Sequence, residues 1–238
     1  MRIYWRVCEK EETNSFVPRW EHKPKMEILK KCWLSVQKNV SDKHSFVIIE
    51  DSCSSETLEW LKSTSNSRDI VIIDGKSTQE GQLDYVKLAN SVDKYTKKEP
   101  DRIHYVLEDD YLHLDNALDI LESVYIDGWE GYVLTYDYPD RYTLDRSKTC
   151  DLILGSRSHW RTVPSSTGVR SALGKTWQAH MREFKQDAYF NSDAHSHMMF
   201  NLVPAICPIP GVSTHLNERC MTPRIDWNTL WDSIVIDD

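Results

Sequence analysis

The sequence predicts an α/β fold with a mostly parallel central sheet flanked by helices. Two observations support this prediction. Segments of strand type and helix type alternate through the first half of the 238-residue chain, as they do in βαβ units. The strand segments are nearly continuous apolar runs, which are typical of parallel strands covered by helices on both faces. A chain of this length can bury a large core, so we expect residues 1–238 to form a single domain.

The first half of the chain is expected to hold four strands separated by three helices. The first helix follows Pro24 and repeats apolar residues at helical spacing. Ser54 and Ser55 precede the second helix as caps. The expected strands are Arg2–Val7, Ser45–Glu50, Asp69–Asp74 and Ile103–Leu107, and the expected helices are Lys25–Val40, Glu56–Lys62 and Gln82–Tyr95.

The second half has shorter and less regular segments. We expect a helix over 115–125, a strand over 131–135, a polar and aromatic loop over 137–142, short strands from Cys150, a helix over 175–185 and a proline-bearing segment over 204–210. No repeat or low-complexity linker separates the two parts. Residues 1–112 and 113–238 are therefore expected to be two halves of the same domain.

The composition excludes several classes of protein. The net charge of −8 comes from acids spread along the chain, so no basic surface for a nucleic acid is expected. No apolar run reaches the ~20 residues needed to span a bilayer, and no signal-peptide core is found. These features predict a cytoplasmic protein without stable membrane insertion. The six cysteines lack CxxC pairing and are expected to be reduced.

Three consecutive acids, Glu108-Asp109-Asp110, directly follow the fourth expected strand. Adjacent carboxylates at the end of a buried strand repel one another and lose solvation, which packing does not explain. A divalent cation would relieve this repulsion and could accept the oxygens of a diphosphate. Ligands of parallel sheets bind beyond the carboxyl ends of the strands, where Asp51 and Asp74 also lie. A solvated acidic turn is the alternative interpretation.

A second candidate metal ligand is His215, which ends the segment Pro208–His215. A neutral imidazole is a good ligand for cations such as Mn²⁺, and the prolines would restrict the loop that carries it. A surface or structural histidine is the alternative.

The order of these motifs resembles that of small stand-alone GT-A glycosyltransferases, family-2-like, including those of large DNA viruses. The resemblance covers nearly the whole chain and runs through Asp51, 75–81, 107–111, 160–167 and 210–215. It implies a GT-A (Rossmann-like) sheet with a smaller C-terminal acceptor-side part. The implied reaction transfers a hexosyl or deoxyhexosyl group from a nucleotide diphosphate sugar, UDP-linked rather than GDP-linked, to a glycan hydroxyl with inversion. A viral enzyme would work in the host cytoplasm.

The acidic triplet is a variant of the DXD motif of this family, with Glu108 in the place of the first Asp. By resemblance, Asp110 and His215 are ligands of Mn²⁺ or Mg²⁺, and Glu108 and Asp109 face the ribose and the metal-bound waters. The glutamate is a departure that affects the expected ribose contact.

The resemblance also assigns the nucleotide site and the acceptor side. Val7 and Cys8 would contact the nucleotide through their backbone, Asp51 would accept from the base, and Gly75 and Gly81 would let the backbone approach the donor. Asp193 resembles the general base that inverting transfer needs, with Asp187 and Asp137 as rivals and helix capping as the alternative role. Arg157 and Trp160, beside Arg161, are candidates for the sugar pocket, or else form a cation–aromatic pair.

Two other functions are compatible with parts of the sequence. A nucleotidyltransferase shares the sheet and the metal carboxylates, but such enzymes generally have a basic, Gly-rich loop after the first strand. Here Cys8-Glu9-Lys10-Glu11-Glu12 would repel a triphosphate. A non-catalytic zinc- or carbohydrate-binding module would use His195, His197, Cys207, His215 and Cys220, whose spacing matches no tight zinc pattern.

Overall fold

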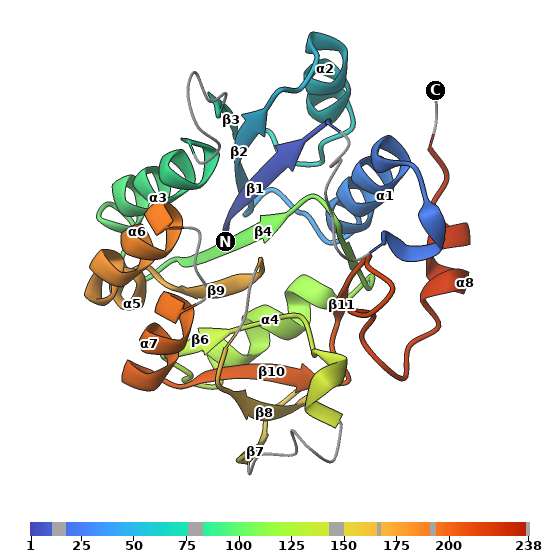
Figure 1. The fold of residues 1–238 in the computed structure, drawn as a ribbon. Coiled ribbons are helices and arrows are strands. Elements are labelled where there is room, and N and C mark those ends of the chain that lie inside the picture. Colours follow the sequence, from blue (N-terminus) through green and yellow to red (C-terminus); the bar gives the residue numbers. More distant parts are fainter. Residues whose placement is uncertain (11–17, 76–82, 143–149, 166–167, 191–193, 237–238) are drawn as a thin grey trace.

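The central feature of the computed structural model is a nine-stranded sheet between two layers of helices (Figure 1), with the strand order β3-β2-β1-β4-β9-β6-β10-β8-β7. The structure describes residues 1–10, 18–75, 83–142, 150–165, 168–190 and 194–236. Strands from both halves of the chain share this sheet. The predicted α/β class is therefore confirmed.

The first half follows the predicted βαβ order closely. Its elements are β1 (Arg2–Cys8), α1 (Lys25–Gln37), β2 (Ser45–Asp51), α2 (Ser55–Ser63), β3 (Ile70–Asp74), α3 (Leu83–Thr96) and β4 (Ile103–Glu108). The strands β3, β2, β1 and β4 are parallel neighbours. Ser54 caps α2, as its side chain accepts a hydrogen bond from the Thr57 amide. All four strands therefore end at the same edge of the sheet.

The second half is mixed in strand direction. Its elements are β5 (Tyr111–His113), α4 (Ala117–Ile126), β6 (Tyr132–Val133), β7 (Leu152–Leu154), β8 (His159–Val163), β9 (Arg170–Leu173), α5 (Gly174–Ala179), α6 (Met181–Phe190), α7 (Ala194–Leu202), β10 (Ala205–Ile209), β11 (Ser213–His215) and α8 (Trp227–Asp232). Strand β9 runs antiparallel to β4 and β6, while β6 and β10 are parallel. β6 and β10 therefore end at the same edge as β1 to β4.

In the second half, one predicted helix is divided, and a segment for which no secondary structure was predicted forms a strand. The helix expected over 175–185 is divided into α5 and α6 at His180. The proline-bearing segment forms the inner strand β10, which pairs with β6 only at Ala205 and Ile206. Because β6 is so short, Pro208 lies beyond it, and its missing N–H removes no ladder bond on that side.

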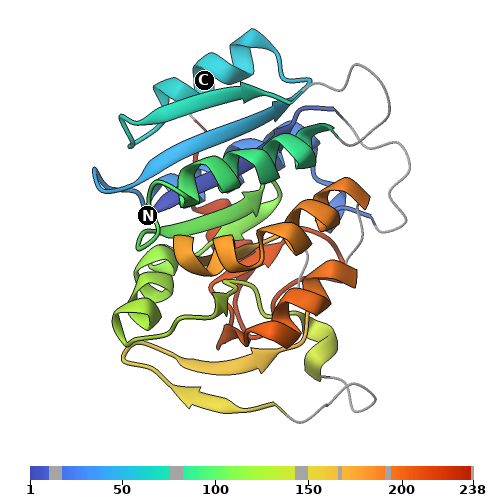
Figure 2. The same cartoon turned by 90° about the vertical axis from the view of Figure 1, so that its left-hand side faces the viewer.

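Each face of the sheet has its own apolar core. Helices α1, α2, α4 and α8 cover one face and α3, α5, α6 and α7 the other (Figures 1 and 2). Strand β1 alternates between them: Trp5 packs in the first core and Tyr4 in the second. Within the described residues, no helix is both long and apolar enough to cross a membrane.

Candidate active site

The acidic triplet lies at the carboxyl edge of the sheet, where β4 ends beside β1. Glu108 is the last residue of β4, and Asp109 and Asp110 follow it. A small second sheet then joins distant parts of the chain, because β5 pairs with β11 and places His215 opposite Tyr111. The Leu216 amide donates to the Asp110 carbonyl oxygen at 2.9 Å. The topology thus brings together two predicted metal ligands that are 105 positions apart.

Asp110 and His215 form a direct side-chain pair. The distance between Asp110 Oδ2 and His215 Nε2 is 2.9 Å, and the His215 ring stacks on Tyr111 with 4.9 Å between centroids and an interplanar angle of 7°. Burial opposes the charged imidazole, but the Asp110 carboxylate raises the pKa of His215 well above its usual range. Burial likewise opposes the charge on Asp110, but His215 lowers the pKa of that carboxyl. These two shifts favour an ion pair between the Asp110 carboxylate and the His215 imidazolium.

This pair fits a divalent cation. Two ligands at right angles in an octahedral Mg²⁺ shell, each ~2.1 Å from the ion, lie ~3.0 Å apart, close to the separation observed here. Asp110 Oδ1 is also buried without a hydrogen-bond partner, and a buried carboxylate oxygen needs a positive neighbour. Across the described residues, no three His, Cys, Asp or Glu side chains are grouped to hold a metal. Within the part of the chain that the structure describes, Asp110 and His215 would be the two protein ligands, with water and phosphate oxygens in other positions, which is typical of Mg²⁺.

Glu108 is held by basic and phenolic partners. Its Oε1 accepts from Arg6 and from the Tyr85 hydroxyl. Arg6 also donates to Asp84 Oδ2 at 2.8 Å, and its guanidinium lies 4.0 Å from the centroid of the Tyr85 ring. The first acid of the triplet therefore orients an arginine at the edge of the site.

Asp109 is held in the same way by Lys25 and the backbone of β1. The distance from Lys25 Nζ to Asp109 Oδ1 is 2.6 Å, and the Cys8 amide donates to Asp109 Oδ2 at 2.8 Å. Both side chains are less than one tenth exposed, at 9% for Lys25 and 8% for Asp109. Burial alone would lower the pKa of Lys25, but Asp109 raises it. Burial raises the pKa of Asp109, whereas Lys25 and the Cys8 amide act in the opposite direction and favour its charged form.

A cavity of about 230 Å³ joins these groups. Its lining includes the acids 108–110, His215 and three basic residues, Arg6, Arg19 and Lys25. The three basic side chains balance the three acids when His215 is neutral, as it would be as a metal ligand. A divalent cation and a diphosphate could therefore share this cavity without a large excess of either charge.

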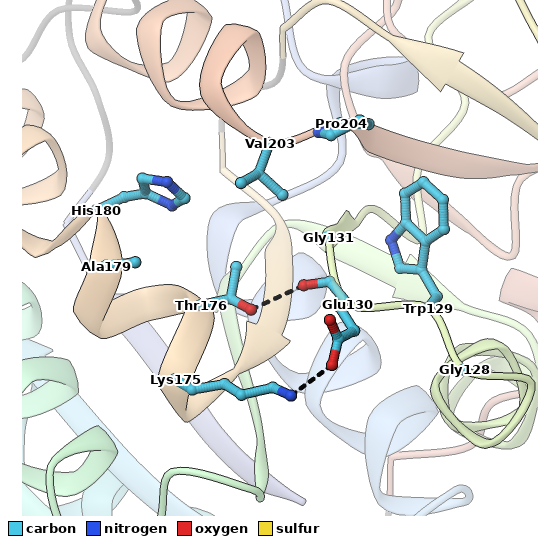
Figure 3. A pocket seen from close by; sticks show the side chains of 10 residues that line it. All are labelled: Gly128, Trp129, Glu130, Gly131, Lys175, Thr176, Ala179, His180, Val203 and Pro204. Carbon is cyan, nitrogen blue, oxygen red and sulfur yellow. Dashed lines mark hydrogen bonds and ion pairs between the residues drawn. The ribbon is translucent and has the colours of Figure 1, made fainter.

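A larger cavity, of about 620 Å³, lies at the opposite edge of the sheet (Figure 3). Gly131 and Pro204, which precede β6 and β10, are part of its lining. Of the described residues that line it, only Glu130 is acidic, and it pairs with Lys175 at 2.5 Å. It lacks the charged groups that distinguish the smaller cavity, which is therefore the candidate active site.

The residues predicted to bind the nucleotide do not all line the candidate active site. Cys8 lines the cavity, but its amide is already donated to Asp109. Val7 is fully buried in the core. Asp51 ends β2, where it accepts from the Ser52 hydroxyl at 2.9 Å. A Cβ at Gly75 would lie 2.4 Å from the Glu50 carbonyl oxygen, so this glycine is required by contact with β2. Gly81 lies outside the described residues.

The residues predicted for the sugar pocket are not gathered around the acidic triplet. Trp160 is fully buried in the core, with no exposed ring face on which a sugar could stack. Arg157 is exposed and lies 3.4 Å from Asp119 of α4. Trp160 therefore lies in the core, and Arg157 lies on the surface.

The candidate bases are only partly described. Asp193 lies outside the described residues, and Asp187 belongs to α6. Asp137 is fully buried, paired with Arg161 and hydrogen-bonded by Tyr142 and Cys207. Burial raises the pKa of Asp137. Its side chain is thus enclosed by protein partners.

The alternative zinc site would use histidines and cysteines from residues 195–220. Cys207 hydrogen-bonds to Asp137, while His215 pairs with Asp110. The side chains of His195 and His197 lie outside the description. All six cysteines are free thiols, with no disulfide between them.

Sequence reasoning did not identify the basic residues of the site. Arg6 faces α3 because it alternates with Trp5 and Val7 along β1, and Lys25 is the first residue of α1. The alternation of Arg2, Tyr4 and Arg6 along one strand face was the available signal. It indicates a polar face, but not that Arg6 meets an acid 102 positions later.

Comparison with known proteins gives only distant similarities. No family model matches the sequence, and no curated protein matches it. Among solved structures, the chain is similar to a putative glucose-1-phosphate thymidylyltransferase from Bacillus anthracis in complex with a sucrose, with a TM-score of 0.49, 11% identity, and 100% of this chain and 97% of that chain covered. It is also similar to CMP:2-keto-3-deoxy-manno-octonic acid synthetase complexed with CTP, with a TM-score of 0.47, 9% identity, and 86% and 87% covered. A third similarity is to the galactosyltransferase LgtC with donor and acceptor sugar analogues, with a TM-score of 0.44, 10% identity, and 86% and 71% covered. At these values, the function has to be inferred from the site itself.

Proposed function

We propose that the protein is a metal-dependent glycosyltransferase of the GT-A type. It transfers a sugar from a nucleotide diphosphate sugar, UDP-linked rather than GDP-linked, to a glycan hydroxyl. The observation that carries this proposal is the Asp110–His215 pair at the end of β4, with a buried Asp110 oxygen that has no partner. The balanced charge of the surrounding cavity supports a site for a cation together with a diphosphate.

Asp110 and His215 would hold Mn²⁺ or Mg²⁺. The bound cation would act as a Lewis acid for the departing diphosphate. His215 must release its proton before Nε2 can serve as a ligand. Tyr111 fixes the plane of the imidazole by stacking on it, so the ring needs little reorientation to bind.

The acceptor side of the proposal depends on a general base. Asp193 stays the predicted base, and inversion follows from the same resemblance. Of its two rivals, Asp137 is less suited, because Arg161 and Tyr142 already occupy its carboxylate. The role of Asp193 is tested by Asp193→Asn, which should retain UDP binding and lose transfer. Loss of UDP binding instead would mean that another residue is the base.

The metal role is tested by Asp110→Ala. Wild-type protein should hydrolyse or transfer from UDP-sugars only with Mn²⁺ or Mg²⁺, and the variant should lose at least about a hundredfold in rate, since it lacks one of two protein ligands. Asp119→Ala is the matched control, because Asp119 is exposed on α4 beside Arg157. Circular dichroism checks the fold of both variants. Full metal-dependent activity in Asp110→Ala would exclude the proposed centre.

A nucleotidyltransferase is the second candidate function. It is favoured by the basic side chains Arg6, Arg19 and Lys25 of the cavity, because cations of this kind suit a triphosphate. The two functions consume different substrates. Release of pyrophosphate from a nucleoside triphosphate and a sugar phosphate would support this candidate, whereas release of UDP from a UDP-sugar supports the glycosyltransferase.

A further inference from the structure

We infer that Arg6 and Lys25 bind the donor diphosphate directly, so that the protein binds a nucleoside diphosphate even without a divalent cation. In this arrangement Glu108 and Asp109 are positioning residues for these two basic side chains and do not belong to the metal shell. The inference rests on the proposed function, because it concerns the same donor site. It assigns roles to four residues around the cavity.

The acids of the triplet have different partners. Glu108 accepts from Arg6, and Asp109 lies 2.6 Å from Lys25 Nζ. Of the three acids of the triplet, only Asp110 has a buried oxygen without a hydrogen-bond partner. The three acids of the motif are therefore not equivalent. Glu108 pairs with Arg6 and Asp109 with Lys25, whereas Asp110 pairs with His215 through Oδ2 and has no partner on Oδ1.

Packing does not account for the Lys25–Asp109 pair. Taking two opposite charges out of water costs about as much as their attraction returns, so such a pair contributes little to stability. Both side chains also line the cavity. A costly ion pair at the wall of a cavity indicates a binding role. Asp109 holds the Lys25 ammonium group in a fixed position at the wall of the cavity.

The orientation of Arg6 is fixed by its partners. Its guanidinium is held by Asp84 at 2.8 Å, by Glu108, and by the face of the Tyr85 ring at 4.0 Å. The side chain retains 24% of its exposure. A guanidinium fixed in this way loses little conformational entropy when it binds a phosphate.

The charge and size of the cavity limit what it can hold. The acids alone would repel a diphosphate, but Arg6, Arg19 and Lys25 balance them. The volume of about 230 Å³ is below the roughly 300–1,000 Å³ of pockets that enclose drug-sized molecules. The cavity therefore suits the diphosphate portion of a donor, with the nucleoside and the sugar outside it.

The experiment measures UDP and GDP binding to the full chain by isothermal titration calorimetry, in EDTA and in Mn²⁺. Wild-type protein should bind at least one of the two nucleotides in EDTA, and more weakly at high salt because the contacts are ionic. Arg6→Lys and Lys25→Met should each weaken binding in EDTA by roughly tenfold to a hundredfold, as expected for loss of a hydrogen bond to a charged group. Lys43→Met is the matched control, because Lys43 pairs with Glu122 on the surface.

A second measurement separates positioning from metal ligation. Asp109→Asn and Glu108→Gln should leave Mn²⁺ affinity unchanged, measured by the electron paramagnetic resonance signal of free Mn²⁺, while both weaken nucleotide binding in EDTA. Lys25→Met leaves a buried carboxylate unpaired and can unfold the protein. The double variant Lys25→Met/Asp109→Asn removes both charges and keeps an acceptor for the Cys8 amide, so it replaces the single variant in that case.

The outcomes distinguish this inference from the proposed function. Nucleotide binding that requires Mn²⁺ and is abolished by EDTA would overturn the inference and leave the metal-dependent transferase intact. Loss of Mn²⁺ binding in Asp109→Asn, with unchanged nucleotide binding in EDTA, would also overturn it. Failure of wild-type protein to bind UDP or GDP under either condition would remove both.

Discussion

The carboxylate of Asp110 differs from those of its two neighbours in one respect on which the proposed function depends. Glu108 and Asp109 have basic partners of their own, whereas Asp110 has a buried oxygen without one. The sequence places all three acids together but does not show which of them keeps a buried carboxylate oxygen without a hydrogen-bond partner. That distinction depends on Arg6 and Lys25, which are far away in the chain. The sequence of the triplet alone therefore cannot predict this difference between the three acids.

Gly168 packs closely against the acidic site, so a substitution at this position tests that packing. Its φ of +76° disfavours other residues, and a Cβ would lie 2.8 Å from Glu108 Oε2 and 2.6 Å from the Tyr111 hydroxyl oxygen. We expect Gly168→Ala to lower the free energy of unfolding by about 1–3 kcal/mol and to weaken nucleotide binding as well. Urea denaturation and calorimetry measure the two effects.

Gly128→Ala is the matched control for this substitution. Gly128 has a φ of +96°, but nothing lies within 4 Å of a Cβ placed there. This variant should lose stability through its backbone alone and bind nucleotide normally. Equal effects of the two substitutions on nucleotide binding would contradict the packing of Gly168 against Glu108.

At the scale of elements, prediction succeeded where the pattern of the segment itself determines the structure. β2 is a continuous apolar run buried on both faces, and its predicted and observed bounds differ by one residue. The strand predicted over 131–135 is present as the shorter β6 (Tyr132–Val133), whereas no strand was predicted for the segment that forms β10 (Ala205–Ile209). β6 has only two residues and β10 contains Pro208, so neighbouring strands rather than local pattern hold them in the sheet. The small β5–β11 sheet, which positions His215, is likewise a product of tertiary structure.

The junction between β1 and β4 provides a prediction of pH dependence. Glu99, just before β4, accepts from Arg2 Nε and Nη2, each at 2.9 Å, and from Arg102 at 3.0 Å. The hydrogen bonds from Arg2 lower the pKa of Glu99 to about 2. A carboxyl with a lowered folded pKa stabilises the protein above its unfolded pKa of about 4.3 and loses this effect as the pH falls toward the folded value.

Glu99→Gln should therefore cost about 2–3 kcal/mol at pH 7, discounted for the 25% exposure of the side chain. The stability difference between wild type and variant should shrink as the pH falls from 5 to 3. Urea denaturation across this range measures it. Glu59→Gln, on the exposed surface of α2, serves as the control and should cost little at any pH. A Glu99→Gln difference that stays constant with pH would contradict the expected shift.

At the scale of the whole molecule, the parallel strands and the antiparallel β5–β11 sheet have one common consequence. They collect at one edge the ends of β1 and β4, the start of α1 and the last residue of β11. The sequence predicted that the acids and His215 would share a site, because the motif order resembles a known family. It did not predict the basic residues, since nothing in the local pattern of Arg6, Arg19 or Lys25 indicates that three separate segments meet.

We propose that Asp110 and His215 together bind a divalent cation that also contacts a donor diphosphate. The most direct measurement is a crystal structure with Mn²⁺ and UDP, with anomalous diffraction recorded at the manganese edge. We expect one anomalous peak within about 2.0–2.4 Å of an Asp110 carboxylate oxygen and of His215 Nε2, with phosphate oxygens completing the shell. UDP bound in the cavity without such a peak, or manganese bound elsewhere on the chain, would contradict it.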